Sequence, residues 1–232
     1  MVLKDRLDHL RGIVKSEKKV KVTELSQRFD VTEETIRRDL ERLELEGLIT
    51  RTHGGAVLKV ENMFDRLGYT HRSRTNVEEK KKIAQIVASI IPMQATLFAD
   101  ASSTVMEALT LMADRDDITV LTNSIPVLSS LNQSGLNIMS TGGANNRVSC
   151  SLQGIIARTT IMNYHVDFVL TSCKGLKLDE GAYDSREGET EIKQLMISRG
   201  QKTIMMADHT KFDRTSFVKY CSFQQIDILV TD

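Results

Sequence analysis

The feature that most constrains the fold is the stretch at residues 20–39, VKVTELSQRFDVTEETIRRD. Apolar residues recur at helical spacing in each half of it, at Leu25 and Phe29 in the first half and at Ile36 in the second, whose pattern continues to Leu40 and Leu43. Residues 30–32 form a tight connection between the halves, and Val31 is placed to fill the space between two helices. Two helices joined by a turn of three or four residues make a helix-turn-helix, so we predict this motif at residues 20–39.

The second of these helices has a polar face. At about 100° per residue, Glu34, Arg38, Glu41 and Arg42 point most directly away from Ile36, and Thr35 and Arg37 lie on the flanks. Of these residues, we predict DNA contacts for Thr35, Arg37, Arg38 and Arg42. Thr32 is a suitable N-cap. Glu33 and Glu34 precede Arg37 and Arg38 by four residues, however, and such pairs also suit an ordinary solvated helix. The helix pair alone therefore leaves a DNA reader and a plain helical hairpin both open.

A glycine turn after the second helix favours the DNA reader. Residues 50–58, TRTHGGAVL, predict a β-hairpin on which Arg51 and His53 are donor-rich side chains. Residues 1–58 are thus expected to form a winged helix-turn-helix domain. The segment TIRRDLERLELEGLITRTHGGAVL closely resembles the N-terminal domain of the DeoR family of bacterial operon repressors, and this resemblance covers residues 3–58.

Charge and cysteine content limit the possible classes of protein. The 232 residues carry no net charge, and residues 1–60 hold 13 Lys and Arg against 11 Asp and Glu. Only the placement of the arginines therefore argues for nucleic acid. Three scattered cysteines without metal-ligand spacing favour a reduced, cytoplasmic chain and no metal site. No apolar run approaches the ~18 residues of a membrane span.

Residues 59–76 lack periodicity and are predicted to be a linker. Residues 78–91 resume a helical pattern, with Ile83, Ile86, Val87, Ile90 and Ile91 expected on its buried side. Short apolar runs then predict strands at 96–99, 118–122, 136–140, 166–172, 202–207 and 227–231. Helical stretches are expected at 103–113, 125–131, 153–162 and 189–198. This alternation predicts that residues 77–232 form an open, mostly parallel α/β sheet covered on both faces.

Polar residues gather where these apolar runs end. They are Asp100, Ser102, Ser103, Thr104, Thr122, Asn123, Gly142, Gly143, Lys174, Asp208 and Lys211. The carboxyl edge of an open α/β sheet is where ligands bind. Residues 102–104 begin a helix, so their hydroxyl and N–H groups suit a phosphate, and the two lysines suit the same anion or sugar oxygens. We therefore predict a site for a phosphorylated sugar or polyol.

Each polar cluster also has a simpler explanation, because strand ends commonly carry turn-forming residues. The succession of five clusters favours a site. Glu187 to Lys193 is a weaker candidate: its carboxylates suit ligand hydroxyls, but the same run suits a solvated helix start equally well.

The second part of the chain also resembles the DeoR family, whose effector domain is similar to ribose-5-phosphate isomerase. The matching segments are residues 100–104, Thr122-Asn123, Gly142-Gly143 and 208–212, and Glu187 and Lys193 match a family glutamate and lysine. Arg72, Asn76, Glu79, Lys80, Ile83 and Ala84 match the start of that domain. Ser102 stands where the family usually has glycine.

The resemblance implies a transcriptional regulator, most often a repressor of a carbohydrate operon, that leaves its operator when it binds a phosphorylated sugar. It implies no cofactor, and a homodimer or homotetramer is expected because one winged unit buries little DNA surface. An isomerase- or deaminase-type enzyme with a DNA-binding appendage is the alternative, since Asp100, Glu187 and Asp208 suit proton transfer. An architectural DNA protein would not need the polar strand ends.

Overall fold

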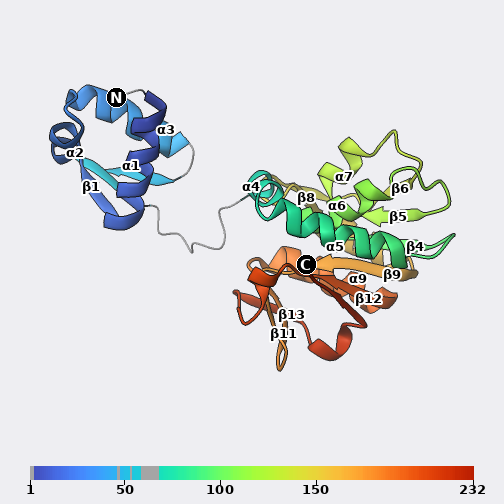
Figure 1. Ribbon diagram of the computed structural model, residues 1–232. Coiled ribbons are helices and arrows are strands. Elements are labelled where there is room, and N and C mark those ends of the chain that lie inside the picture. The colour runs from blue at the N-terminus through green and yellow to red at the C-terminus, as the bar shows by residue number, and fades with distance from the viewer. Residues whose placement is uncertain (1–2, 46–47, 53, 59–67) are drawn as a thin grey trace. The chain divides into compact units, whose positions relative to one another are not determined.

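The structure is a computed structural model that describes residues 3–45, 48–52, 54–58 and 68–232. The chain divides into two compact units, Met1–Arg66 and Leu67–Asp232 (Figure 1). Each unit has its own apolar core, and each is described by itself below.

The first unit packs three helices on a small antiparallel sheet with the strand order β1-β3-β2. Its elements are α1 (Leu3–Glu17), β1 (Lys19–Lys21), α2 (Val22–Phe29), α3 (Glu33–Leu45), β2 (Ile49–Thr52) and β3 (Gly55–Leu58). Strands β2 and β3 form the predicted hairpin. Strand β1 was not predicted; it pairs with β3 so closely that a Cβ on Gly55 would overlap the Val20 carbonyl oxygen. Glycine is therefore required at residue 55.

The core of the first unit follows the sequence pattern. The fully buried residues include Leu25, Ile36, Leu40 and Leu43, and Phe29 and Val31 pack against them. Asp30 adopts the left-handed conformation (φ 50°) that ends α2, and the Thr32 hydroxyl accepts the Thr35 N–H at 3.3 Å. These local features confirm two helices joined by a three-residue turn.

The second unit is built on a six-stranded parallel sheet with the order β14-β12-β9-β4-β5-β6. Its strands are β4 (Thr96–Ala99), β5 (Thr119–Thr122), β6 (Asn137–Ser140), β9 (Val166–Ser172), β12 (Gly200–Met206) and β14 (Ile228–Val230). Its main helices are α5 (Val77–Ile90), α6 (Ser103–Leu111), α7 (Ile125–Ser130), α8 (Ile155–Met162) and α9 (Glu187–Arg199). The predicted ranges match these within two residues at each end.

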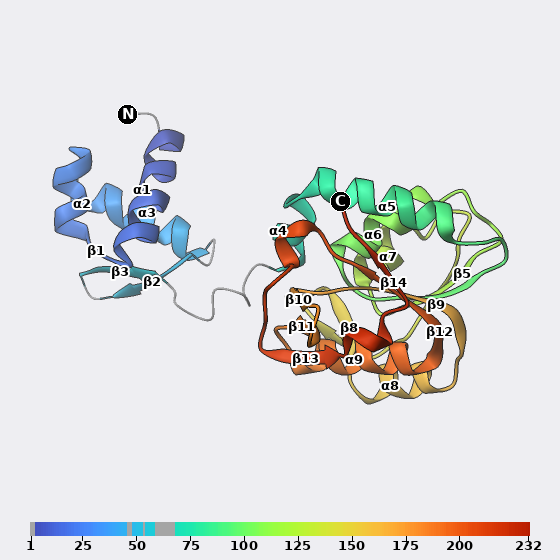
Figure 2. The same cartoon turned by 60° about the horizontal axis from the view of Figure 1, so that its bottom comes forward.

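Helices cover both faces of this sheet (Figures 1 and 2). Leu97 packs in a cluster with residues of α5, α6 and α7, whereas Phe98 packs on the other face with residues of α8 and α9. Because successive strand residues point to opposite faces, a strand that is apolar throughout serves two cores. The predicted doubly covered parallel sheet is confirmed.

Several short elements escaped prediction. They are the hairpin β7 (Ala144–Asn146) and β8 (Ser151–Gln153), the small sheet β10 (Gly175–Lys177), β11 (Gly181–Asp184) and β13 (Val218–Cys221), and two 3-10 turns, η1 (His209–Lys211) and η2 (Phe223–Gln225). These strands hold three or four residues of mixed polarity. Their backbone pairing, rather than an apolar run, defines them.

Two predictions near the start of the second unit need correction. The predicted linker ended at residue 76, but residues 69–74 form helix α4 (Tyr69–Arg74), which belongs to the second unit; the preceding residues 59–67 lie outside the described part of the chain. On α5, Ile86 and Ile90 are 45% and 38% exposed rather than buried. The buried stripe of α5 is centred between Ile83 and Ala84, which turns Ile86 toward solvent.

Candidate functional site

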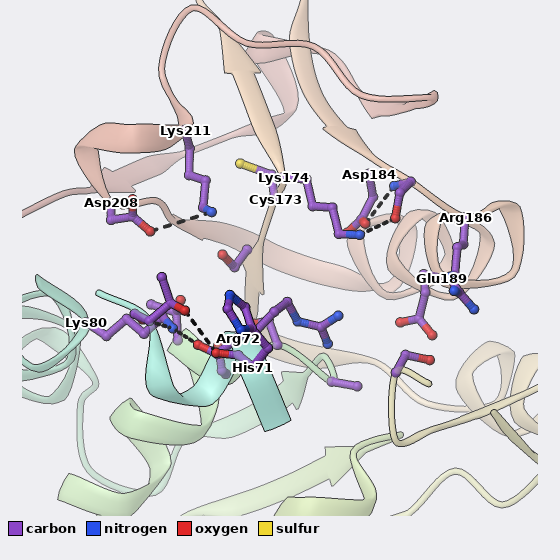
Figure 3. A pocket seen from close by; sticks show the side chains of 18 of the residues that line it. His71, Arg72, Lys80, Cys173, Lys174, Asp184, Arg186, Glu189, Asp208 and Lys211 are labelled. Atoms are coloured by element: carbon purple, nitrogen blue, oxygen red, sulfur yellow. Dashed lines mark hydrogen bonds and ion pairs between the residues drawn. The ribbon is translucent and has the colours of Figure 1, made fainter. Parts of the chain in front are cut away.

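A cavity of about 160 Å³ opens at the carboxyl ends of β4, β9 and β12, the three strands in the middle of the sheet (Figure 3). Its walls come from α4, the start of α5, the start of α6, the loop after β9, the start of α9 and the turn η1. The lining residues include His71, Arg72, Thr75, Asn76, Lys80, Ser102, Ser103, Thr104, Ser149, Ser172, Lys174, Asp184, Ser185, Arg186, Glu189, Lys193, Asp208 and Lys211. Six of these are Lys or Arg and three are Asp or Glu, so the cavity is rich in cations.

Seven of the predicted effector residues line this cavity. They are Ser102, Ser103, Thr104, Lys174, Lys193, Asp208 and Lys211. Ser102 is the N-cap of α6, and its hydroxyl accepts the Val105 N–H at 3.4 Å. The buried Ser103 and Thr104 follow it at the positive end of the helix dipole. Strand β4 thus delivers a helix start directly to the cavity.

Asp100 does not line the cavity but organises its floor. Its Oδ1 accepts the Ser102 N–H at 2.9 Å, and its Oδ2 accepts the Thr171 hydroxyl at 2.8 Å and the Ser172 N–H at 3.1 Å. The carboxylate is 1% exposed. Asp100 therefore fixes the loop between β4 and α6 and the end of β9.

Lys193 is a buried cation at the base of the cavity. Its Nζ lies 2.6 Å from Asp184 Oδ2 and 3.3 Å from Asp100 Oδ2, and it donates to the Ser172 carbonyl at 2.6 Å. It also lies 5.2 Å from the centre of the Tyr220 ring. Burial opposes the charge, but Asp100 and Asp184 raise the pKa of Lys193 well above its ordinary value. Lys193 therefore remains protonated and holds three chain segments together.

Thr122, Asn123, Gly142, Gly143 and Glu187 do not line the cavity. Strands β5 and β6 lie to the far side of β4, which moves their ends away from the site. The Thr122 hydroxyl donates to Ala99 O, and Asn123 Nδ2 donates to Leu152 O. Gly142 and Gly143 have φ values of 65° and 114°, and a Cβ on Gly143 would overlap Gln153 O. Hydrogen bonds to neighbouring strands thus engage the Thr122 hydroxyl and the Asn123 amide nitrogen, and turn geometry and close packing account for the two glycines.

The carboxylate that helix α9 presents to the cavity is Glu189 rather than the exposed Glu187. Glu189 accepts hydrogen bonds from Ser151 and Gln153 of strand β8. Glu189 and Lys193 stand four apart on α9, and both are buried. The i,i+4 spacing was the signal that could have selected Glu189 from the sequence.

The largest group of residues that sequence reasoning missed comes from α4 and the start of α5. His71, Arg72 and Thr75 line the cavity, as do Asn76 and Lys80 (Figure 3). Arg72, Asn76 and Lys80 had been matched to the family but not assigned to the site. Interpreting residues 59–76 as a linker hid them, because six helical residues without a buried apolar stripe give no periodic signal.

The predicted DNA contacts lie on α3 and on β2. The side chains of Arg37, Arg38, Arg42 and Arg51 are exposed, and Thr35 is half-buried. Arg37 pairs with Glu33 at 2.6 Å, and Arg38 lies 3.6 Å from Glu34. His53, predicted on the wing, lies outside the described residues. The arginines of α3 thus have weak, solvated partners that phosphates can replace.

An ion pair with α1 holds the buried side of α3 in place. Arg6 of α1 contacts Asp39 of α3 through two hydrogen bonds, 2.6 and 3.3 Å long, and Asp39 is 1% exposed. The hydrogen bond to Asp39 raises the pKa of Arg6.

Among the described residues, no helix has both the length and the apolar character needed to cross a membrane.

Comparison with known proteins gives matches over nearly the whole chain. Residues 6–62 match the DeoR-like helix-turn-helix domain, and residues 75–232 match the DeoR C-terminal sensor domain. The HTH-type transcriptional repressor GlcR of Bacillus subtilis is 32% identical over 100% of this chain and 89% of its own length. The L-fucose operon activator of Haemophilus influenzae is 32% identical over 94% of this chain and 88% of its own length.

Solved structures were compared as well. Ribose 5-phosphate isomerase A from Methanocaldococcus jannaschii superposes with a TM-score of 0.46 at 10% identity, covering 60% of this chain and 55% of the isomerase.

Proposed function

Because this chain belongs to the DeoR family of transcriptional regulators, we propose that it represses a carbohydrate operon and leaves its operator when a phosphorylated sugar or polyol binds the sensor cavity. It is a DNA-binding transcriptional regulator. The carbohydrate link draws support from a relative named for the L-fucose operon. A repressor of this kind acts in the cytoplasm, where its operator lies.

The observation that carries the proposal is the composition of the cavity. Lysine and arginine side chains line the same cavity as the start of α6, a combination that suits a dianionic phosphate. Asp208 and Glu189 add carboxylate oxygens that can accept hydrogen bonds from hydroxyl groups. At about 160 Å³ the cavity is smaller than the ~300–1,000 Å³ typical of sites for drug-sized ligands. A short polyhydroxylated phosphate fits both the chemistry and the size.

Calorimetry with matched phosphorylated and unphosphorylated sugars tests this proposal. The phosphorylated member of the matching pair should bind far more tightly, because each charge-assisted hydrogen bond contributes about 1.5–3 kcal/mol. Thr104→Val keeps the shape at the start of α6 but removes a hydroxyl, so this variant should bind operator normally and fail to release it. Equal affinities within every sugar pair would exclude a phosphate seat in this cavity.

We also propose that the sensor binds its ligand without turning it over. The residues that suit acid–base chemistry are engaged structurally: Asp100 accepts three hydrogen bonds, and Lys193 is held protonated between two carboxylates. Incubation with ribose 5-phosphate and a panel of hexose phosphates separates the two cases. Saturable binding with unchanged sugar supports a sensor, whereas an isomerised or deaminated product would establish an enzyme.

The regulator should act as a dimer or tetramer. A single winged unit buries roughly 600–1,000 Å², which is less than the ~1,000–2,500 Å² of typical specific complexes with DNA. Two units on one duplex predict half-sites about one helical turn, ~10–10.5 bp, or a multiple of it apart. Light scattering that gives the mass of a monomer, both for the free protein and for its DNA complex, would contradict this expectation.

A further inference from the structure

Helix α4 occupies a special place in the sensor unit. It is the first described element after residues 59–67, which join the sensor to the DNA-binding unit along the chain. The same helix forms one wall of the cavity through His71 and Arg72 (Figure 3), and Thr75, which directly follows the helix, lines the cavity as well. A ligand in the cavity therefore touches the segment through which the sensor is attached to the winged unit.

The start of α4 is fastened to a loop that lines the cavity. The Tyr69 N–H donates to the Val148 carbonyl at 3.0 Å. Gly68 lies against the same carbonyl, since a Cβ there would be 3.0 Å from Val148 O. Val148 and its neighbour Ser149 both line the cavity.

The end of α4 is fastened by residues that face the ligand space. Lys80 of α5 is 5% exposed, and its ammonium donates to the carbonyls of Arg72 and, at 2.6 Å, of Thr75. Asn76, which has the left-handed φ of 51°, donates to Asp208 Oδ1 at 3.1 Å. Lys80, Asn76 and Asp208 all line the cavity. An anionic ligand would thus meet the groups that hold α4 in place.

The ammonium of Lys80 is poised to respond to an anion. Burial, together with the nearby Lys211, lowers the pKa of Lys80 to about 8, while Asp208 and Glu107 oppose that shift and Arg72 adds to it. The charge on Lys80 is therefore poorly compensated without a ligand. A phosphate nearby would stabilise this charge and compete with the two carbonyls for its N–H groups.

We propose that α4 is the element that couples the sensor cavity to the winged unit, with Lys80 as its latch. In the ligand-free protein, Lys80 caps the carbonyls at the end of α4 and Arg72 faces the cavity. An anionic ligand draws Lys80 and Arg72 to itself, releases those carbonyls, and thereby shifts the point where residues 59–67 enter the sensor. This inference rests on the proposed function, because it requires that the effector in the cavity is an anion.

Such a latch meets the thermodynamic condition for allostery. The ligand has different contacts in the two states of α4, so it can shift the balance between them. Coupling of this kind typically changes the affinity for the other ligand by about 5–150-fold. DNA must therefore weaken effector binding by the same factor by which the effector weakens DNA binding.

Lys80→Met tests the latch even without a ligand. The variant keeps the apolar stem but removes the ammonium, so α4 should adopt its released state. We expect full-length Lys80→Met to bind a DNA duplex, selected from random sequence with the wild-type protein, about tenfold more weakly than wild type. Lys81→Met is the matched control, since Lys81 is an exposed lysine of the same helix that pairs with Glu78. Lys81→Met should bind like wild type.

A second variant guards against a folding artefact. Asn76→Gly tolerates the left-handed backbone and removes the hydrogen bond to Asp208, so it should also weaken DNA binding, by about threefold or more. Hydrogen exchange of amides 69–76 should be faster in both variants than in Lys81→Met, with the exchange of the central strands unchanged. Wild-type DNA affinity in folded Lys80→Met and Asn76→Gly would overturn the proposal.

The same measurements are then repeated with ligands, using ribose 5-phosphate and the hexose phosphates of the panel as probes. A probe that binds the wild type should speed exchange at residues 69–76 and weaken DNA binding. If no sugar phosphate binds, the proposed function fails, while the ligand-free comparison of Lys80→Met with Lys81→Met still decides the role of α4. A probe that binds and releases DNA but leaves exchange at residues 69–76 unchanged would place the coupling elsewhere.

Discussion

The exposed face of α3 in the first unit and the cavity of the second unit use charge in opposite ways. On α3 of the first unit, Arg37 and Arg38 are exposed and pair with glutamates of their own helix. In the second unit, Lys193 and its partners Asp100 and Asp184 are buried and join separate strands and loops. Exposed pairs contribute about 0–1 kcal/mol and exchange partners readily, whereas breaking a buried pair costs several kcal/mol. The first arrangement suits a surface that must take up phosphates, and the second suits a cavity that must keep its shape.

The largest predicted effect tests the buried half of this contrast. Lys193→Met leaves Asp100 and Asp184 without their cation, so the sensor unit should lose about 3–5 kcal/mol of unfolding free energy. Urea unfolding followed separately in each unit measures this, and the first unit should be unaffected. Lys177→Met removes a half-buried surface lysine that pairs with Glu180, and it should change stability by no more than about 0.5 kcal/mol. Similar losses of unfolding free energy in Lys193→Met and Lys177→Met would show that the buried ion pairs contribute no more to stability than the surface pair.

The exposed half is tested on DNA. Arg38→Ala should cost about 1–3 kcal/mol of operator binding and relax specificity, because this side chain is expected to reach the major groove. Arg37→Ala should weaken all sequences alike and reduce the salt slope by about one. Arg158→Ala, an exposed arginine of the sensor unit, serves as the control. A double variant of Arg37 and Arg38 that shifts a fixed-salt gel like the wild type would exclude α3 as the recognition helix.

A smaller effect is expected of pH on ligand affinity. It concerns Lys80, whose ammonium is buried like that of Lys193 but has no comparably close carboxylate among the described residues. The pKa of Lys80 is lowered to about 8 by burial, with Lys211 contributing. An anionic ligand favours the protonated form and raises this pKa. Between about pH 7 and pH 8 the ammonium is largely present and the phosphate is dianionic, so affinity changes little there, and above pH 8 binding must take up a proton. Affinity should then fall by up to about tenfold per pH unit.

Calorimetry at pH 9 in two buffers of different ionisation enthalpy measures that proton uptake. The phosphate itself has its second pKa near 6, so it does not titrate in this range. Lys80→Met should show no uptake, and Lys81→Met should match the wild type. Equal uptake by Lys80→Met and wild type would assign the proton to another group.

Much of the architecture followed from the sequence because the signals were periodic. The helix pair of the first unit and the six parallel strands of the second each bury a regular stripe or run, as Ile36 and Leu97 illustrate. Strand ends also identified Ser102, Lys174 and Asp208 as neighbours of one cavity. Both inferences depend only on local pattern and on the rule that parallel strands share an edge.

The residues predicted after β5 and β6 that do not line the cavity were misplaced because strand order could not be read from the sequence. Thr122 and Gly142 follow β5 and β6, and only the pairing of β4 with β9 shows that the cavity forms on the other side of β4. Helix α4 was missed for another reason: it is too short and too polar to give a periodic signal in the sequence. Its role depends on Lys80 and Asn76, which hold it through hydrogen bonds that no spacing in the sequence reveals.

The pairing of β4 with β9 and of β9 with β12 has a consequence for the order of synthesis. Strand β4 can pair early with β5, but its other partner, β9, lies about 70 residues later in the chain, and Asp208 follows β12 close to the end of the chain. The winged unit, by contrast, has been translated in full before the first cavity residue, His71, is added to the chain. Since units fold from the N-terminus during synthesis, we expect ribosome-bound chains to acquire a protease-resistant winged unit well before the sensor. Each new molecule would thus fold its DNA-binding domain first and complete its effector cavity last.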